Sequence, residues 1–142
     1  MAEGAMLAGI AFSNSGVAAV HALAYPLGAR FHVSHGTANG LLLPYVMKCN
    51  LSADPIRYAF VAGILGEQTE GLAPIEAANL GVKAVEKLVK DIGLPHRLRD
   101  LNVPREALEG MAVATMDVTR LLANNPKTLT LDDVRGIWQD AW

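Results

Sequence analysis

The chain has 142 residues, of which 51% are hydrophobic and 18% charged, and its net charge at pH 7 is −2. This length and composition are typical of one globular domain and exclude a disordered chain. No block of Lys or Arg gives the electrostatic footprint of a nucleic-acid-binding protein, and the apolar runs are too short to span a bilayer. We therefore expect neither a nucleic acid nor a membrane as a partner.

The N-terminal stretch MAEGAMLAGIAF has the composition of the middle of an apolar helix, with no Ser, Thr, Asp or Asn to cap it. It also lacks the basic start of a signal peptide. A single cysteine, Cys49, forms no internal disulfide and suits a reducing cytosol. We expect a cytoplasmic protein whose chain is a piece of something longer.

The next helix carries VAAVHALA and is predicted to end near Ala24, because Pro26 disfavours helical geometry at Tyr25 and removes a backbone donor. Gly28 continues the predicted break. A second helix is predicted to begin at Ser34, which can cap it, and to run through HGTANGLLL.

These boundaries place His21 in the last turn of one helix and His35 in the first turn of the next. A loop of about ten residues between them is long enough to turn the chain back. We therefore expect the two imidazoles to face one point.

Further helix starts are predicted at Pro55 after the capping Asp54, and at Pro104 for a helix running through Ala123. Thr130 and Asp133 resemble a capping box before the last helix. Pro74 starts the most clearly marked helix, which ends before Gly93 and Pro95. Its apolar positions recur at three and four residues and predict one buried face: Ala78, Val82, Val85, Leu88, Val89 and Ile92. No alternating strand pattern occurs, so the prediction is a single all-α domain over residues 1–142.

Three of the four histidines, His21, His32 and His35, fall within seventeen residues. Two neutral imidazoles from neighbouring helices form half of a typical transition-metal site, which needs one or two further ligands. The residues alone leave the commoner alternative open, a helix-terminal histidine that hydrogen-bonds locally. Tyr25, four residues after His21, either lines the same pocket or is an ordinary half-buried tyrosine. His96 follows Pro95 in a loop and is expected at the surface.

Taken together, these residues resemble the iron-containing, or group III, alcohol dehydrogenases. The resemblance rests on AGIAFSNSG, on VHALAYPLG, on HG opening a helix that continues to LLPYVMKCN, and on the closing NNPKTLTLDDVRGIWQDAW. It implies the C-terminal helical domain of that family, a dehydroquinate-synthase-like α-domain, over essentially the whole chain. It also implies that the N-terminal dinucleotide-binding α/β domain is absent from this sequence.

The resemblance implies roles for six residues. His21 and His35 correspond to two histidine ligands of the catalytic metal, which is Fe²⁺ or in some members Zn²⁺. Phe12 and Leu121 fall at substrate-lining positions. Tyr25, where many members have histidine, and His32, a residue of a subgroup, are the candidates to relay a proton to solvent.

The function implied is interconversion of alcohols with aldehydes or ketones by hydride transfer to NAD or NADP, in an enzyme expected to be a homo-oligomer. In the family, an Asp and a further His from an earlier helix complete the metal site, and a glycine-rich loop binds the nucleotide. Neither is present in this sequence, so the chain alone is expected to be inactive. Two other hypotheses remain: a non-catalytic helical module that binds itself or a partner, and a haem-binding bundle that uses His21 or His35 axially.

Overall fold

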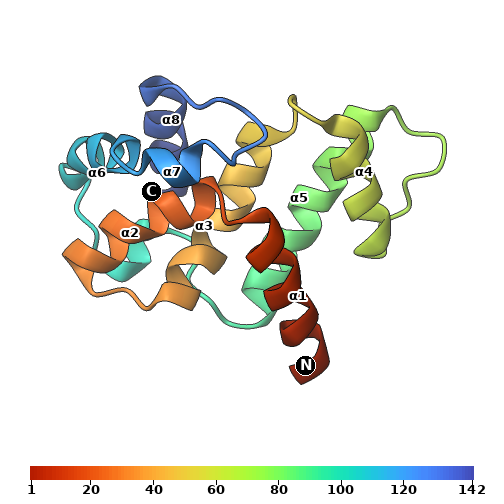
Figure 1. The fold of residues 1–142 in the computed structure, drawn as a ribbon, viewed down its shortest axis with the longest axis horizontal. Coiled ribbons are helices and arrows are strands. Elements are labelled where there is room, and N and C mark those ends of the chain that lie inside the picture. The colour runs from red at the N-terminus through yellow and green to blue at the C-terminus, as the bar shows by residue number, and fades with distance from the viewer.

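The computed structural model describes all 142 residues and contains no β-strand, as predicted (Figure 1). Its helices are α1 (Ala2–Ser15), α2 (Ala19–Phe31), α3 (His35–Asn50), α4 (Pro55–Ile64), α5 (Pro74–Asp91), the short 3₁₀ helix η1 (Leu98–Leu101), α6 (Ala107–Met116), α7 (Thr119–Leu122) and α8 (Leu131–Ala141).

The core lies on both sides of α3. A cluster of eighteen buried residues joins α2, α3, α6 and α8, and Trp138 of α8 is its largest fully buried side chain. A second cluster of six residues joins the C-terminal part of α3 to α5. In Figure 1, α4 and α5 accordingly stand on one side of α3, and α2, α6 and α8 on the other.

The predicted end of α2 near Ala24 is wrong, because the helix continues through Pro26 and Gly28 to Phe31. A proline inside a helix costs about 3 kcal/mol or more. Burial outweighs that cost here, since Leu23 and Leu27 lie one turn apart on one face and both are fully buried.

The helix instead ends at His32, which adopts the left-handed conformation with φ 54° and donates its N–H to the carbonyl of Gly28. His21 is therefore in the first turn of α2 and not in its last turn. The start of the next helix agrees with the prediction, since the Ser34 hydroxyl accepts the N–H of Thr37 and α3 begins at His35.

The helix predicted from Pro104 through Ala123 is divided in two. It starts only at Ala107, after a turn in which the Ala107 N–H bonds to the Pro104 carbonyl. It breaks at Val118, where ψ is 51°. Just before the break, the buried Thr115 hydroxyl donates to the carbonyl of Met111 at 2.8 Å, a bond of the kind that bends helices. The break allows α7 to turn and pack against α2.

Helices α4 and α5 begin at Pro55 and Pro74, as predicted from the sequence. Asp54 accepts the N–H of Arg57, and the Glu76 carboxylate accepts the N–H of Ala73. On the predicted buried face of α5, Ala78, Val82, Val85 and Val89 are buried, whereas Leu88 and Ile92 are 51% and 60% exposed. The predicted face is too wide because α4 and α3 cover only part of it. The α4–α5 contact is close: a Cβ added at Gly81 would lie 3.2 Å from the Cβ of Ala62.

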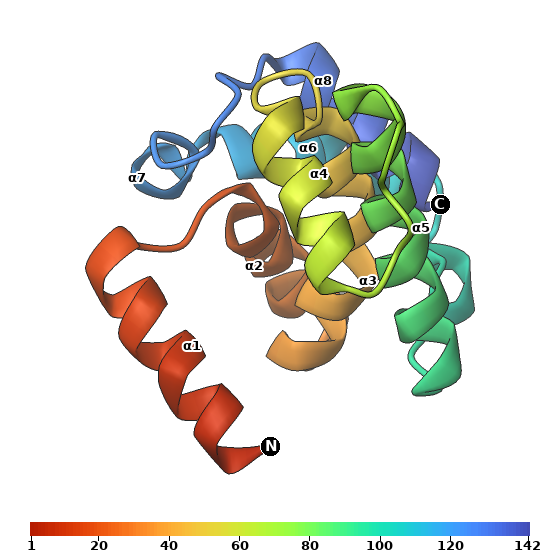
Figure 2. The same ribbon diagram turned by 90° about the vertical axis from the view of Figure 1, so that its right-hand side faces the viewer.

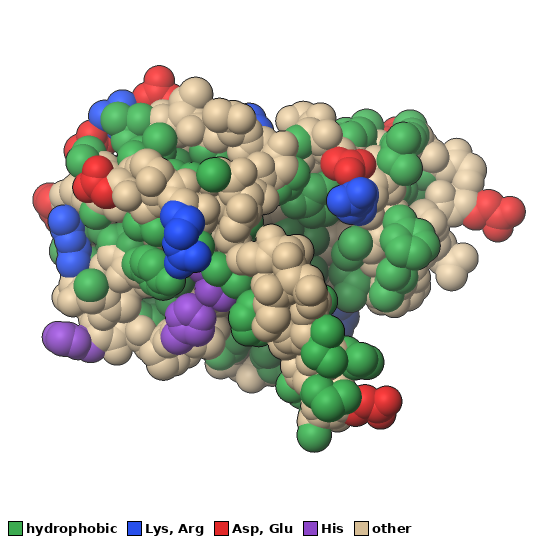
Figure 3. Space-filling model, viewed as in Figure 1, with side chains coloured by type: hydrophobic (Ala, Val, Ile, Leu, Met, Phe, Trp, Pro, Cys, Tyr) green, Lys and Arg blue, Asp and Glu red, His purple; other side chains and the backbone are tan.

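The first helix, α1, projects from the body and buries none of its residues (Figure 2). Gly16, with φ 75°, makes the turn that follows it, and the Asn124 amide holds this turn by donating to the Val17 carbonyl at 3.1 Å. Hydrophobic side chains lie at the surface of α1 and around α4 (Figure 3). The large ones are Met6, Leu7, Ile10 and Phe12 on α1 and Ile56, Phe60 and Ile64 on α4.

No single helix is long and apolar enough to cross a membrane. Helices α1 and α2 reach the length and apolar composition of a membrane span only when they are counted together, and the chain bends by 103° between them.

The capping box predicted at α8 is present and gives a prediction about stability at acid pH. The Asp133 carboxylate accepts the N–H and hydroxyl of Thr130 at 2.9 Å and pairs with Lys127 at 2.7 Å. The bond from Lys127 and then those from Thr130 lower the pKa of Asp133 from 3.8 to about 2. A lowered pKa contributes stability that is present above about pH 4 and is lost as the pH falls toward 2.

We therefore expect Asp133→Asn to reduce the free energy of unfolding at pH 7 by about 1–2 kcal/mol, and by progressively less between pH 4 and pH 2. Urea denaturation followed by circular dichroism across this pH range measures the difference. A difference between the two proteins that stays constant down to pH 2 would contradict the assignment. Asp117→Asn is the control, because the Asp117 carboxylate, at the C-terminal end of α6, makes no hydrogen bond or ion pair.

Candidate metal centre

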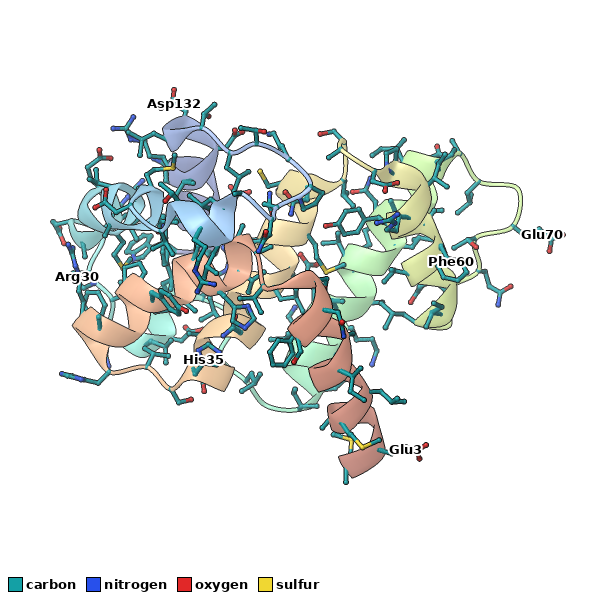
Figure 4. All side chains as sticks on the ribbon, viewed as in Figure 1. Glu3, Arg30, His35, Phe60, Glu70 and Asp132 are labelled. Atoms are coloured by element: carbon teal, nitrogen blue, oxygen red, sulfur yellow. The ribbon has the colours of Figure 1, made fainter.

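His21 and His35 come together on one side of the molecule. Their ring centroids are 5.1 Å apart and the planes are inclined by 55°. Figure 4 shows His35 at the beginning of α3, beneath α2, and Figure 3 shows histidine side chains gathered there at the surface. The prediction that the chain brings the two imidazoles together is confirmed.

The route of the chain between them differs from the predicted ten-residue loop. Only residues 32–34 connect α2 to α3, and they return along α2. The carbonyl oxygen of Val33 lies 3.4 Å from the position that a Cβ at Gly28 would occupy. A side chain at Gly28 would crowd this return, so the glycine helps to bring His35 back toward His21.

Both histidines project from the first turn of a helix, and His21 is half-buried while His35 is exposed. Burial, and secondarily the neighbouring His35, lower the pKa of His21. The lowered pKa favours the neutral imidazole of His21, which is the form that binds a metal ion.

The spacing of the two rings fits one shared metal ion. A nitrogen ligand about 2.1 Å from the ion places two ring centroids roughly 4.6–5.3 Å apart when the angle between the two ligands at the ion lies between 90° and 109°. The observed separation of 5.1 Å falls in this range. Within the 142 residues, no group of three or more His, Cys, Asp or Glu side chains is positioned to hold a metal ion. The chain therefore provides two ligands of a site that needs more.

An open, mostly apolar groove of about 370 Å³ lies beside His21. It is lined by Gly16, Val17, Ala18, Val20, His21, Asn39, Gly40 and Leu43. Asn39 is a residue that the sequence reasoning missed. Its side-chain nitrogen is 3.2 Å from Nε2 of His35 and donates to the carbonyl of His35 at 2.8 Å. Its position four residues after His35 could have identified it, because residues four apart lie on the same face of a helix.

The other candidates lie at different distances from this pair. Tyr25 is one turn beyond His21 on α2 and is 48% exposed. His32 is exposed at the opposite end of α2, about 16 Å from His21 along the helix axis at 1.5 Å per residue. Phe12 is 54% exposed on α1, whereas Leu121 of α7 is 1% exposed and lies in the interior beside α2. Tyr25 thus lies on the same face of α2 as His21, whereas His32 lies at the far end of that helix.

Comparison with known proteins identifies relatives over the whole chain. The sequence profile described as "Fe-containing alcohol dehydrogenase family, C-terminal" matches residues 1–142. Over all 142 residues the chain is 42% identical to long-chain-alcohol dehydrogenase 1 of Geobacillus thermodenitrificans and 39% identical to lactaldehyde reductase of Escherichia coli. It is 44% identical to 1,3-propanediol dehydrogenase of Citrobacter freundii. The chain spans 36–37% of the length of these relatives.

Solved structures agree with these matches. An alcohol dehydrogenase from Oenococcus oeni superposes with a TM-score of 0.92 at 40% identity, over 96% of this chain and 36% of its own. A 1,3-propanediol oxidoreductase superposes with the same TM-score at 36% identity, over 96% of this chain and 35% of its own.

Proposed function

This chain belongs to the Fe-containing alcohol dehydrogenase family and matches its C-terminal part, and we propose that it forms the metal- and substrate-binding portion of an NAD(P)-dependent alcohol dehydrogenase. The observation that carries the proposal is the pair of imidazoles at 5.1 Å beside an apolar groove. The identity of 39–44% with three dehydrogenases or reductases that act on alcohols or aldehydes supports it.

In the proposed site, His21 and His35 hold a divalent ion together with ligands from outside these 142 residues. We propose iron, since the family is named for it, with zinc as the alternative to be tested. When bound, such an ion acts as a Lewis acid that polarises the oxygen of an alcohol or a carbonyl compound. The half-buried imidazole of His21, whose lowered pKa favours the neutral form, is suited to bind it.

The remaining residues are proposed to shape the site and to carry a proton. The half-exposed Tyr25 stands one turn from His21, where its hydroxyl can hold a proton between the site and solvent. Phe12 would narrow the substrate channel if α1 closes over the groove. Leu121 is buried beside α2, and residues of α2 line the groove. We therefore propose that Leu121 affects the substrate indirectly, by holding α2 in place. His32 has less support as a proton carrier because α2 separates it from His21.

The substrate class that we propose is aliphatic alcohols and the corresponding aldehydes. The groove fits this class, since mainly apolar residues line it. The relatives named for long-chain alcohols, lactaldehyde and 1,3-propanediol differ widely in substrate length, so the chain does not distinguish among them. NAD or NADP would be bound mainly by a domain outside this chain. We further propose a cytoplasmic homo-oligomer, to which the exposed apolar residues of α1 and α4 could contribute.

A chimaera tests the proposal. This chain replaces the matching 142 residues of the Escherichia coli lactaldehyde reductase, with which it is 39% identical. We expect the chimaera to bind iron and to oxidise an alcohol with NAD, while the 142-residue chain alone, which has no β-strand and so no α/β nucleotide-binding domain, is expected to oxidise no alcohol. A chimaera that folds, as judged by circular dichroism, but holds no metal would contradict the proposal. Alcohol oxidation by the isolated chain would contradict the second expectation.

A further inference from the structure

Asn39 makes two contacts with the same histidine. Its side-chain nitrogen donates to the backbone carbonyl of His35 at 2.8 Å and lies 3.2 Å from Nε2 of the His35 ring. An amide nitrogen carries two hydrogens, so both contacts can be donated at once.

The first contact fixes the orientation of the amide. Turning it over would place the side-chain oxygen 2.8 Å from the carbonyl oxygen of His35, and two acceptors repel at that distance. The oxygen of Asn39 is instead buried without a partner. A buried acceptor without a partner is costly. Turning the amide would leave its N–H group without a partner in place of the oxygen, and would add the repulsion between the two oxygens. The group that faces Nε2 is therefore an N–H.

A ring nitrogen that faces an N–H must accept, so Nε2 of His35 carries the lone pair and Nδ1 carries the proton. We propose that Asn39 is a positioning residue that sets this tautomer of His35 and thereby selects Nε2 as the nitrogen that binds a metal ion. The inference rests on the proposed metal site. It assigns to Asn39 a role in choosing the ligand atom, because binding through Nδ1 would need a proton on Nε2, where it would clash with the N–H of Asn39.

Capture of the ion requires only a small movement of Asn39. Its N–H leaves Nε2, while the bond to the His35 carbonyl persists and keeps the side chain on the same face of α3.

The ¹⁵N chemical shifts of the His35 ring in the metal-free, 142-residue chain test the proposal in mildly alkaline buffer. We expect the Nδ1–H tautomer in the unaltered chain. Asn39→Leu should lower the ratio of Nδ1–H to Nε2–H about fivefold, which is the worth of one hydrogen bond. Asn39→Asp keeps the size of the side chain and offers only acceptors, so it should favour the Nε2–H form even if the leucine variant folds poorly.

Asn79→Leu is the matched control. Asn79 on α5 makes the same bond to the carbonyl four residues earlier, Ile75 at 2.7 Å, without a histidine nearby. It should leave the His35 shifts unchanged. An Nε2–H tautomer in the unaltered chain, or identical tautomers in the chain and both Asn39 variants, would overturn the inference.

Adding Zn²⁺ to the same sample separates this inference from the proposed function. If the Nδ1–H tautomer is found and zinc shifts Nε2 of His35, both are supported. If that tautomer is found but zinc perturbs neither His21 nor His35, the role of Asn39 in setting the tautomer stands and the proposed metal site fails. If zinc binds His35 through Nδ1, the metal site stands and the inference fails.

Discussion

Replacing either His21 or His35 by alanine is expected to weaken the binding of Fe²⁺ or Zn²⁺ to the 142-residue chain at least tenfold, to an undetectable level. The two imidazoles lie together and no group of three or more His, Cys, Asp or Glu side chains surrounds them, so each variant leaves a single histidine at this site. Even intact, two ligands hold an ion weakly. Titration calorimetry, performed without oxygen for iron, measures the loss.

The matched control for this experiment is His96→Ala. The contact made by His96 is through its backbone carbonyl, which accepts the Tyr45 hydroxyl at 2.6 Å and survives the substitution. His96→Ala should bind metal as the unaltered chain does. Unchanged binding in His21→Ala or His35→Ala, or equal loss in His96→Ala, would show that the ion binds elsewhere.

Trp138→Ala is expected to cause the largest loss of stability, about 3–5 kcal/mol. Trp138 is the largest fully buried side chain and lies where α8 packs on α3 and α6. A domain of this size typically has a free energy of unfolding of about 5–15 kcal/mol, so the variant would lose a large part of it. Urea denaturation at pH 7, with helix content as the signal, measures the change.

Two further variants test whether the loss in Trp138→Ala comes from the cavity that the substitution leaves. The indole N–H of Trp138 is buried without a partner, so Trp138→Phe loses no hydrogen bond and should cost only roughly 1–2 kcal/mol. Val113→Ala on α6, at a position 48% exposed, should cost far less than either. A loss in Trp138→Phe as large as that in Trp138→Ala would contradict the cavity explanation.

Local signals in the sequence were sufficient for most helix starts. Ser34, Asp54 and Thr130 each cap a helix as predicted, because a short polar side chain before an apolar periodic segment satisfies the free N–H groups of the first turn. The fold class followed from helical periodicity and the lack of alternating segments.

The errors arose where tertiary contacts outweigh local preference. Pro26 predicts a helix end, but the burial of Leu23 and Leu27 carries α2 through it. Leu88 has the spacing of a buried position and is half exposed, because no other element of the chain covers it. Periodicity cannot show how much of an apolar face is covered.

The sequence predicted that His21 and His35 come together, but not the path of the chain that brings them together. The residue types and the family resemblance both pointed to His21 and His35. Their approach depends on the return of residues 32–34 along Gly28, which no local rule describes. The distance of His32 from His21 follows from the continuation of α2 to Phe31, whereas the contact of Asn39 with His35 is a local one between residues four apart on α3.

The most direct test of the proposed metal site is a crystal structure of this chain grown with Zn²⁺, with anomalous scattering used to locate the ion. The proposal predicts one ion between the two rings, about 2.0–2.1 Å from one nitrogen of His21 and one nitrogen of His35, with solvent completing the coordination. An ion bound only at other residues, or intact rings at 5.1 Å with no ion between them at saturating zinc, would contradict it.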